Sequence, residues 1–408
     1  MEVIIAGAGL AGMYAAWLLE RAGHDVQVLE ASHRVGGRTW SHKLSNGEVV
    51  ERGGEYIGPD QHLIRRVCAE LELPLIPHGI VFNRRWMAEG TRYSTEQLAE
   101  AEQQLHGTID GFTERGRHNA SLLDAARETW GNDAYVEHPV WIRIATSLAN
   151  DPGKVSARGY LTRERGRRSV YLEHGARVLS GNQAITLEIE KRLSKPVLLG
   201  HRVTSVQQDA GKVTLETSNG TSFVADFAVI AIPLLPLREV VKDVELPEIM
   251  RGAIDARVMG AAAKISAATE GSGPPMGVQY PGALWWTWNS LASDDDCGRE
   301  AVTAFAGGQR TVEELALEDG GMGWKTKISS YRTDLTISDE IIVTDWTQDP
   351  LIGGGYSAPG VAWKPEFATA FEEAAGRIAI AGEHTSESSM NGSLRSGERA
   401  ANALLRHG

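Results

Sequence analysis

The chain has 408 residues, a formal net charge of −12 and a hydrophobic content of 42%, which suits a globular protein with a sizeable core. The acidic balance argues against nucleic acid as a partner. Only two cysteines are present, Cys68 and Cys297, and no Cys/His cluster has metal-ligand spacing, so neither a disulfide framework nor a metal site is expected. No apolar run reaches the roughly 18 residues of a membrane span, and the first residues read as a strand rather than a signal peptide. We therefore expect a cytoplasmic protein without a membrane partner.

The beginning of the chain contains a nucleotide-binding pattern. A four-residue apolar run at residues 3–6 is too short for a helix and ends in glycines, so it predicts a buried parallel strand. Gly7, Gly9 and Gly12 follow with the spacing G-x-G-x-x-G and open into a helical pattern. Such glycines permit a tight turn, a close approach to a pyrophosphate and close packing of the helix on the sheet. A second strand at residues 25–29 then delivers Glu30, whose carboxylate can accept hydrogen bonds from an adenosine ribose.

The residues after this unit point to one dinucleotide. Residues 34–39 read R-V-G-G-R-T, which resembles the R-x-G-G-R-x-x-T/S signature of glutathione-reductase-like FAD folds in amine oxidases, amino-acid oxidases and carotene desaturases. The resemblance implies that the cofactor is FAD. The cofactor-binding candidates in this stretch are Ala31, Arg34, Gly37, Arg38 and Thr39.

Residues 51–59, E-R-G-G-E-Y-I-G-P, resemble the D/E-x-G-G-x-y-x-G-P segment of the flavin monoamine oxidase family. The resemblance places Gly53, Gly54 and Glu55 near the cofactor and gives Tyr56 a place in the substrate pocket. A helix is expected over residues 61–71. The following stretch alternates charged helical patterns, such as 95–105 and 122–128, with loops and contains no dinucleotide motif, so we expect it to belong to a substrate-binding part.

Near residue 169 the chain is expected to return to the nucleotide-binding domain with which it begins. A helix is expected over residues 178–193 and strands over 196–199, 203–207, 212–217 and 222–232, with Asn219-Gly220 as a hairpin turn. By resemblance to the family, Val203 contacts the adenine through its backbone. The aromatic run at residues 284–288 predicts a strand covered on both faces.

Residues 257–265 resemble the family segment whose lysine holds a water at flavin N5, and Lys264 lies at the matching position. An unpaired ammonium inside an apolar strand is costly to bury, so this lysine must find a partner or stay hydrated.

The last segment resembles the same family at three places. Trp346 with the G-G-G-Y stretch ending at Tyr356 is similar to a W…GG-x-Y pattern, which makes Trp346 a pocket residue and Tyr356 one wall of an aromatic cage. The A-G-E-x-T motif places Gly382 and Glu383 at the cofactor. Residues 390–401, beginning with Met390, match a closing helix whose N-terminus points at the flavin, where its dipole stabilises the anionic reduced ring.

Two departures from the family pattern bear on mechanism. Members with covalent flavin carry a cysteine where this chain has Gly355, so FAD is expected to be non-covalent. The second cage wall directly precedes Met390 and is Ser389 here, a residue that we count as lining both the substrate pocket and the cofactor. With half of the cage missing, the pocket gains room for a bulkier substrate, a secondary amine or an amino acid.

The expected fold is α/β: a Rossmann-type FAD-binding domain with a parallel sheet, assembled discontinuously, together with a mixed α+β substrate-binding domain. The FAD-binding domain is expected to combine residues 1–75, 169–252 and 349–408. The substrate-binding domain is expected to combine residues 76–168 and 253–348.

The resemblance implies an amine oxidase that removes hydride from the carbon next to nitrogen, giving an imine that hydrolyses to an aldehyde or ketone, and H2O2 when oxygen reoxidises the flavin. Lys264 and Tyr356 are the catalytic candidates. The expected partners are a small-molecule amine and oxygen, and a homodimer is left open.

Three alternatives stay open. An L-amino-acid oxidase needs an arginine for the substrate carboxylate, which Arg84, Arg85 or the stretch 163–168 could supply. A desaturase or redox-neutral flavoenzyme is compatible with the same fold. A non-catalytic flavoprotein is the third.

Overall fold

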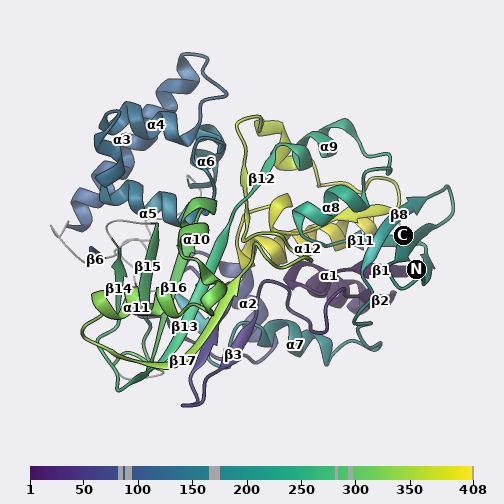
Figure 1. Ribbon diagram of the computed structural model, residues 1–408. Helices are drawn as coiled ribbons and strands as arrows, with labels where there is room; N and C mark the ends of the chain where they lie inside the picture. Colours follow the sequence, from purple (N-terminus) through teal and green to yellow (C-terminus); the bar gives the residue numbers. More distant parts are fainter. Residues whose placement is uncertain (81–85, 88–93, 165–174, 281–283, 293–296, 407–408) are drawn as a thin grey trace.

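The computed structural model describes residues 1–80, 86–87, 94–164, 175–280, 284–292 and 297–406. It has the expected α/β architecture, with one parallel sheet on the right of Figure 1 and a second, larger sheet at the lower left beneath a group of helices.

The parallel sheet joins segments from the beginning, middle and end of the chain. Its strand order is β19-β11-β1-β2, and all three pairings are parallel. The strands are β1 (Glu2–Ala6), β2 (Asp25–Leu29), β11 (Phe227–Ile230) and β19 (Ile378–Ile380). They read as nearly continuous apolar runs because both faces of the sheet are covered.

Alternate residues of β1 enter two different cores. Val3 and Ile5 pack with the helices α1 (Leu10–Arg21), α7 (Ala184–Glu190) and α12 (Met390–Leu405). Ile4 and Ala6 face the other core, which contains the three-stranded antiparallel sheet β10-β9-β8 and the helices α8 and α9. These elements are β8 (Val203–Gln208), β9 (Val213–Thr217), β10 (Ser222–Ala225), α8 (Leu234–Val240) and α9 (Glu248–Asp255).

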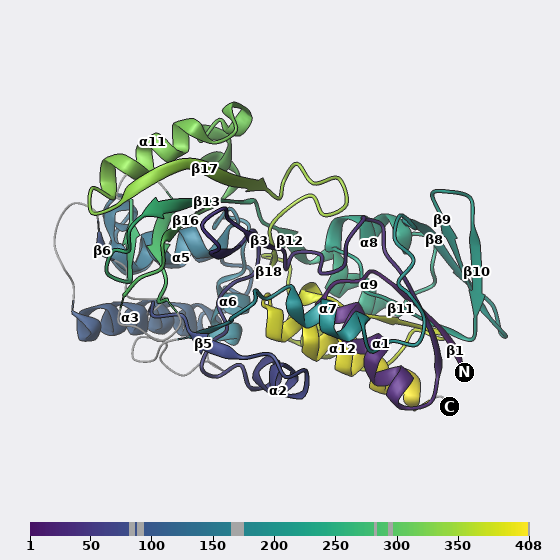
Figure 2. The same ribbon diagram turned by 90° about the horizontal axis from the view of Figure 1, so that it is seen from below.

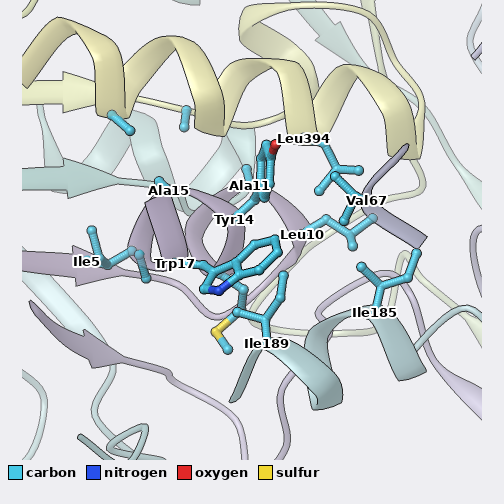
Figure 3. Packing of buried hydrophobic residues seen from close by; sticks show 14 of the residues in the cluster. Ile5, Leu10, Ala11, Tyr14, Ala15, Trp17, Val67, Ile185, Ile189 and Leu394 are labelled. Carbon is cyan, nitrogen blue, oxygen red and sulfur yellow. The ribbon is translucent and has the colours of Figure 1, made fainter. Parts of the chain in front are cut away.

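Helix α1 is enclosed between α12 and α7. Figure 3 shows Ile185 and Ile189 of α7 facing Leu10 and Trp17 of α1, with α12 on the opposite side. The two long helices cross so closely that a Cβ atom added at Gly397 would lie 2.3 Å from the carbonyl oxygen of Ala11. The crossing therefore requires a residue without a side chain.

The second sheet has six strands in the order β17-β13-β16-β15-β14-β6. Its strands are β6 (Trp86–Met87), β13 (Ala262–Glu270), β14 (Met276–Gln279), β15 (Trp285–Asn289), β16 (Ala301–Gly307) and β17 (Thr336–Asp345). Ala263 and Ile265 pack in a core with α10 (Gln309–Glu314) and α11 (Met322–Tyr331), which covers one face in Figure 2. Because side chains alternate along a strand, Lys264 points to the opposite face.

Four helices form a separate core beside this sheet. They are α3 (Thr95–Glu114), α4 (Leu122–Trp130), α5 (Pro139–Leu148) and α6 (Ala157–Glu164). Capping boxes at Ser94 and Ser121 start α3 and α4, and both helices extend beyond their predicted ends. The remaining elements are β3 (Ser41–Lys43), β4 (Val49–Glu51), α2 (His62–Glu70), β5 (Leu75–Pro77), β7 (Ala176–Val178), β12 (Arg257–Met259) and β18 (Ser357–Pro359).

Three sequence-based elements were wrong. The predicted helix 178–193 contains a strand end, then a turn with Gly181 at φ +95°, and α7 begins only at Ala184. The predicted strand 222–232 is two strands, because the chain passes at Asp226 from the hairpin sheet into the parallel sheet. The predicted strand 196–199 forms only an isolated bridge, from Leu198 to Leu29.

The hairpin turn at Asn219-Gly220 is confirmed between β9 and β10, and the strand predicted over the aromatic run is confirmed as β15, buried on both faces. The predicted domain boundaries stay a prediction, and residue 169 lies outside the described residues. In the described ranges no helix is both long and apolar enough to cross a membrane.

The crossing of α1 and α12 generates a stability prediction. Gly397→Ala forces a methyl group against the α1 backbone and should lower the free energy of unfolding by about 1–3 kcal/mol. Gly107→Ala is the matched control, because an added Cβ at this exposed position in α3 has no neighbour within 4 Å. There the same substitution should raise stability by about 0.5–1 kcal/mol. Urea unfolding of both variants checks the opposite signs, and equal effects would contradict the packing argument.

Candidate functional site

A cavity of about 440 Å³ extends from the glycine-rich loop of β1 and α1 to the six-stranded sheet and to α5. This volume lies within the range of small-molecule and cofactor sites, about 300–1,000 Å³. Nearly all site residues predicted from the sequence line it: Gly7, Gly9, Glu30, Ala31, Arg34, Gly37, Arg38, Thr39, Gly53, Gly54, Glu55, Tyr56, Val203, Lys264, Trp346, Tyr356, Gly382, Glu383, Ser389 and Met390. Gly12 is the exception, since it packs against Gly7, whose carbonyl oxygen an added Cβ would approach to 1.9 Å.

The loop end of the cavity suits the phosphates of a dinucleotide. Gly9 is the N-cap of α1, and a Cβ added there would have no protein atom within 4 Å, so its backbone is open to a ligand. Nη1 of Arg34 is buried and has no hydrogen-bond partner among the described residues. A helix N-terminus and a buried guanidinium nitrogen with free N–H groups together favour an anion such as a pyrophosphate.

Glu30 is held at the edge of this loop by two backbone amides. The amide of Ala8 donates to Oε2 at 2.7 Å and that of Ser32 donates to Oε1 at 2.8 Å. Each carboxylate oxygen can accept a second hydrogen bond, so the geometry leaves acceptors for ribose hydroxyls.

Glu383 lines the cavity and also links three segments of the chain through hydrogen bonds. Nη1 of Arg38 donates to its carboxylate at 2.9 Å and to the carbonyl oxygen of Gly355 at 2.7 Å, and the hydroxyl of Ser357 donates to its second oxygen at 2.9 Å. Burial by itself raises the pKa of Glu383, but the charge of Arg38 and further neighbours outweigh it and bring the pKa to about 2. The carboxylate is therefore ionised at neutral pH.

The Gly-Gly turn that follows β4 is packed on all sides. A Cβ added at Gly53 would lie 1.9 Å from the carbonyl oxygen of Arg38, and one at Gly54 would lie 3.0 Å from Met390. The side-chain amide of Asn182 donates to the carbonyl oxygens of Gly54 at 3.0 Å and Glu55 at 2.7 Å. This turn is thus fixed against both the cofactor loop and α12.

Lys264 reaches from β13 to this turn and is only 5% exposed. Its Nζ donates to Oε2 of Glu55 at 2.8 Å and to the carbonyl oxygen of Gly53 at 3.1 Å. The other carboxylate oxygen of Glu55 accepts from Nε1 of Trp288 at 2.9 Å and lies 3.0 Å from Nε2 of His78. The partner that the sequence required for Lys264 is therefore Glu55, whose side chain we had expected at the cofactor.

The charges in this cluster follow from its burial and its pairing. Burial raises the pKa of Glu55, but Lys264 and His78 more than compensate, so the net pKa lies well below its usual range. Burial lowers the pKa of His78. At neutral pH the cluster therefore contains a carboxylate and a neutral imidazole that donates from Nε2.

Glu51 ends strand β4, just before the Gly-Gly turn, and its pKa is shifted in the opposite direction from that of Glu55. Its carboxyl group accepts from the backbone amide of Asn182 at 2.7 Å and from the hydroxyl of Ser41 at 2.9 Å. No cation contacts it among the described residues, so burial and the nearby charge of Glu55 raise its pKa to about 7. This group titrates near neutrality without lining the cavity.

Tyr356, which the sequence predicts as one wall of an aromatic cage, lines the cavity beside α5. The hydroxyl group of Tyr356 donates to the carbonyl oxygen of Ser147 on α5, which fixes the ring. Ser389 serves α12 as its N-cap, because its Oγ accepts from the amide of Gly392 at 2.9 Å. Tyr56 packs edge-to-face on His78 with ring centroids 5.3 Å apart, and Nε1 of Trp346 donates to the carbonyl oxygen of Arg52 at 3.1 Å.

The structure adds residues that the sequence motifs did not identify. The helices of residues 76–168 and strand β16 contribute further lining side chains: Arg143, Ile144, Ser147, Leu148, Tyr160 and Phe305. Arg143 is paired with Glu102 at 2.9 Å. The helical periodicity of α5 could have indicated a buried face but not its contact with the cavity. Arg84, Arg85 and most of the stretch 163–168, considered above for carboxylate binding, lie outside the described residues.

Comparison with known proteins gives a consistent result. A family model described as flavin containing amine oxidoreductase matches residues 10–405. An L-amino acid dehydrogenase of Synechocystis sp. is 24% identical over 99% of this chain and 94% of its own length. The flavin-containing amine oxidase A of Equus caballus is 25% identical over 99% of this chain and 85% of its own.

Solved structures share the fold along the whole chain. Cyclohexylamine oxidase from Brevibacterium oxydans superposes with a TM-score of 0.82 at 20% identity, covering 100% of this chain and 99% of its own. Putrescine oxidase bound to putrescine superposes with a TM-score of 0.81 at 19% identity and the same coverage.

The raised pKa of Glu51 predicts a pH dependence of stability. The folded state holds a proton on Glu51 that the unfolded chain releases above about pH 4.3, so its contribution to stability should decline as the pH rises from there to about 7. The decline should amount to roughly 3 kcal/mol and should be missing from Glu51→Gln. Urea unfolding of both proteins across this range gives the difference, and parallel curves would contradict the assignment.

Proposed function

The chain belongs to the family of flavin-containing amine oxidoreductases, and on this premise we propose that it oxidises the carbon–nitrogen bond of an amine substrate with FAD and oxygen. The observation that carries the proposal is that one cavity joins the nucleotide-binding loop to Lys264 and Tyr356. The products would be an imine, hydrolysed to an aldehyde or ketone, and H2O2.

The bound flavin would supply the redox chemistry, accepting hydride from the carbon next to nitrogen and passing the electrons to oxygen. The protein contributes positioning and electrostatics. Tyr356, tied to the carbonyl oxygen of Ser147, forms one rigid side of the substrate space. The N-terminus of α12, capped by Ser389, presents its dipole to the cavity and so favours negative charge on a reduced cofactor. Lys264 adds a donor group to the wall formed by the six-stranded sheet.

Non-covalent attachment of FAD is part of the proposal. A Cβ added at Gly355 would lie 2.6 Å from the Cβ of Ala262, so a cysteine side chain has no space there without a backbone shift.

The substrate space is bounded on one side by α5 and α6. Ile144 and Leu148 give it an apolar surface, and Tyr160 brings one aromatic ring of the helical segment into the cavity. Because Ser389 stands where a second cage ring is expected, the space beside the substrate nitrogen is wide. It therefore favours an amine that carries bulky groups near its nitrogen over a slender primary amine. A cytoplasmic location and a homodimer stay predictions.

The first test is anaerobic bleaching of the flavin absorbance of the purified holoenzyme by monoamines, diamines, secondary amines and L-amino acids, with peroxide assayed after oxygen is admitted. We expect one class of amine to bleach the flavin and to yield peroxide. Lys264→Met should slow flavin reduction or reoxidation by about a hundredfold, the typical cost of removing one preorganised donor. Lys191→Met, at the exposed residue that follows the last turn of α7, is the control and should have no effect.

Bleaching by amines without peroxide would indicate an acceptor other than oxygen. Failure of every compound would instead favour a desaturase, a redox-neutral flavoenzyme or a non-catalytic flavoprotein. Unchanged reduction and reoxidation in Lys264→Met would remove its proposed role.

Arg143 gives a specific reason to retain L-amino acids as a second substrate class. It places a guanidinium group on the cavity wall, where it could pair with a substrate carboxylate, although Glu102 already neutralises its charge. One curated relative is an L-amino acid dehydrogenase.

Two substitutions separate the substrate classes. For an amino-acid substrate, Arg143→Met should weaken binding about 10- to 100-fold, and Glu102→Gln should leave it unchanged or strengthen it, because the guanidinium group loses its competing anion. For an amine substrate, neither substitution should alter the apparent Kd by more than a few-fold. Stopped-flow titration of flavin reduction measures these constants.

A further inference from the structure

The strongest unassigned arrangement in the molecule is the pair of buried charges on the cavity wall. The Lys264 and Glu55 side chains are 6% and 8% exposed, and they come from positions 209 residues apart in the chain. Two charges withdrawn from water in this way are stable only when hydrogen bonds satisfy both. The question is what each member of the pair does for the other.

Glu55 is held by three hydrogen-bond donors. Nε1 of Trp288 and Nε2 of His78 contact one carboxylate oxygen, and Lys264 contacts the other. Its backbone is held as well, since Asn182 donates to its carbonyl oxygen at 2.7 Å. A carboxylate fixed at both its backbone and its side chain is a rigid anchor.

Lys264 is held by this anchor with two of its three N–H groups. One donates to Glu55 and another to the carbonyl oxygen of Gly53, which leaves one N–H without a protein acceptor among the described residues. The same Nζ lies 5.1 Å from the ring centroid of Trp288, a distance at which a cation and an aromatic ring attract each other. Because these two acceptors are fixed, the direction in which the remaining N–H of Lys264 points is fixed as well.

We propose that Glu55 is a positioning residue for Lys264: it holds the ammonium group at the cavity wall, with one N–H available to the flavin region. Lys264 then acts as a fixed hydrogen-bond donor. This inference rests on the proposed function only in that flavin occupies the cavity beside Lys264.

The competing assignment is that Glu55 acts directly on the cofactor, as its sequence position suggested. The two roles predict different effects on the reduction potential of the bound flavin. A direct role makes the effect of removing the carboxylate independent of Lys264. A positioning role makes it depend on Lys264, because a buried ammonium that loses its counter-ion deprotonates or moves away.

The experiment is a double-mutant cycle on the holoenzyme without substrate, using Glu55→Gln, Lys264→Met and the double variant, with the flavin potential measured by dye equilibration. In the K264M background, Glu55→Gln removes a carboxylate charge that the hydrogen bonds of Trp288 and His78 still stabilise, and it should raise the reduction equilibrium constant at least tenfold, which is about 30 mV for a two-electron couple. In the wild-type background, the same substitution should leave the constant unchanged or lower it, because the positive charge is lost together with the negative one. Equal rises in both backgrounds would overturn the proposal.

Glu51→Gln is the matched control for loss of a buried carboxylate. It alters the neighbouring strand but keeps the contacts of Lys264, so the flavin potential should stay within twofold of the wild-type equilibrium. A shift as large as that expected in the K264M background would also count against a specific role for Glu55.

A second measurement covers variants that fail to retain flavin. The same four proteins are unfolded in urea after removal of the cofactor, and Glu55 and Lys264 should be coupled by at least tenfold in the unfolding equilibrium constant. Additive effects would overturn the pairing on which the proposal depends. Neither measurement uses a substrate, so a failure of the bleaching experiment would affect the proposed function alone.

Discussion

A buried ammonium group needs acceptors that replace its lost hydration, and Lys264 meets this need by crossing from the six-stranded sheet to the Gly-Gly turn of the nucleotide-binding segment. The buried carboxylate of Glu55 in turn needs hydrogen-bond donors, which His78 and Trp288 supply. Asn182 completes the chain of contacts by binding the turn through its side chain and Glu51 through its backbone. The two halves of the cavity are therefore joined by a polar cluster in which each member satisfies another.

The opposite side of the cavity depends on backbone geometry. Helices α1 and α12 both begin at the cavity, and their close crossing at Gly397 brings the two N-termini to the same cavity. Ser389 illustrates how one position serves two demands. A serine hydroxyl can cap α12, which an aromatic ring cannot do, and the same side chain is too small for the second ring of the cage that the family resemblance predicts.

Patterns local in the sequence predicted the parallel strands and the glycine-rich loop, because each depends on neighbours a few residues away, and Lys264 was singled out by resemblance to a family segment. The polar cluster around Lys264 was not predictable in this way, since its members Glu55, His78 and Trp288 come from three separate segments. The strand predicted over residues 222–232 was wrong for a related reason. Its apolar residues continue through Asp226, whereas the partner strand changes from β9 to β1. The apolar pattern of a strand indicates that it is buried, but it does not indicate which sheet the strand joins.

The edge strand β19 comes from residues 378–380, and Glu383, which binds Arg38 across the chain, follows it directly. During synthesis, the amino-terminal loop is therefore made long before the elements that enclose it. Loop closure over such separations is slow and entropically costly. Stable retention of the cofactor must await synthesis of nearly the whole chain, so the nascent protein is for most of its synthesis an incomplete apoprotein in which β11 lacks its neighbour β19.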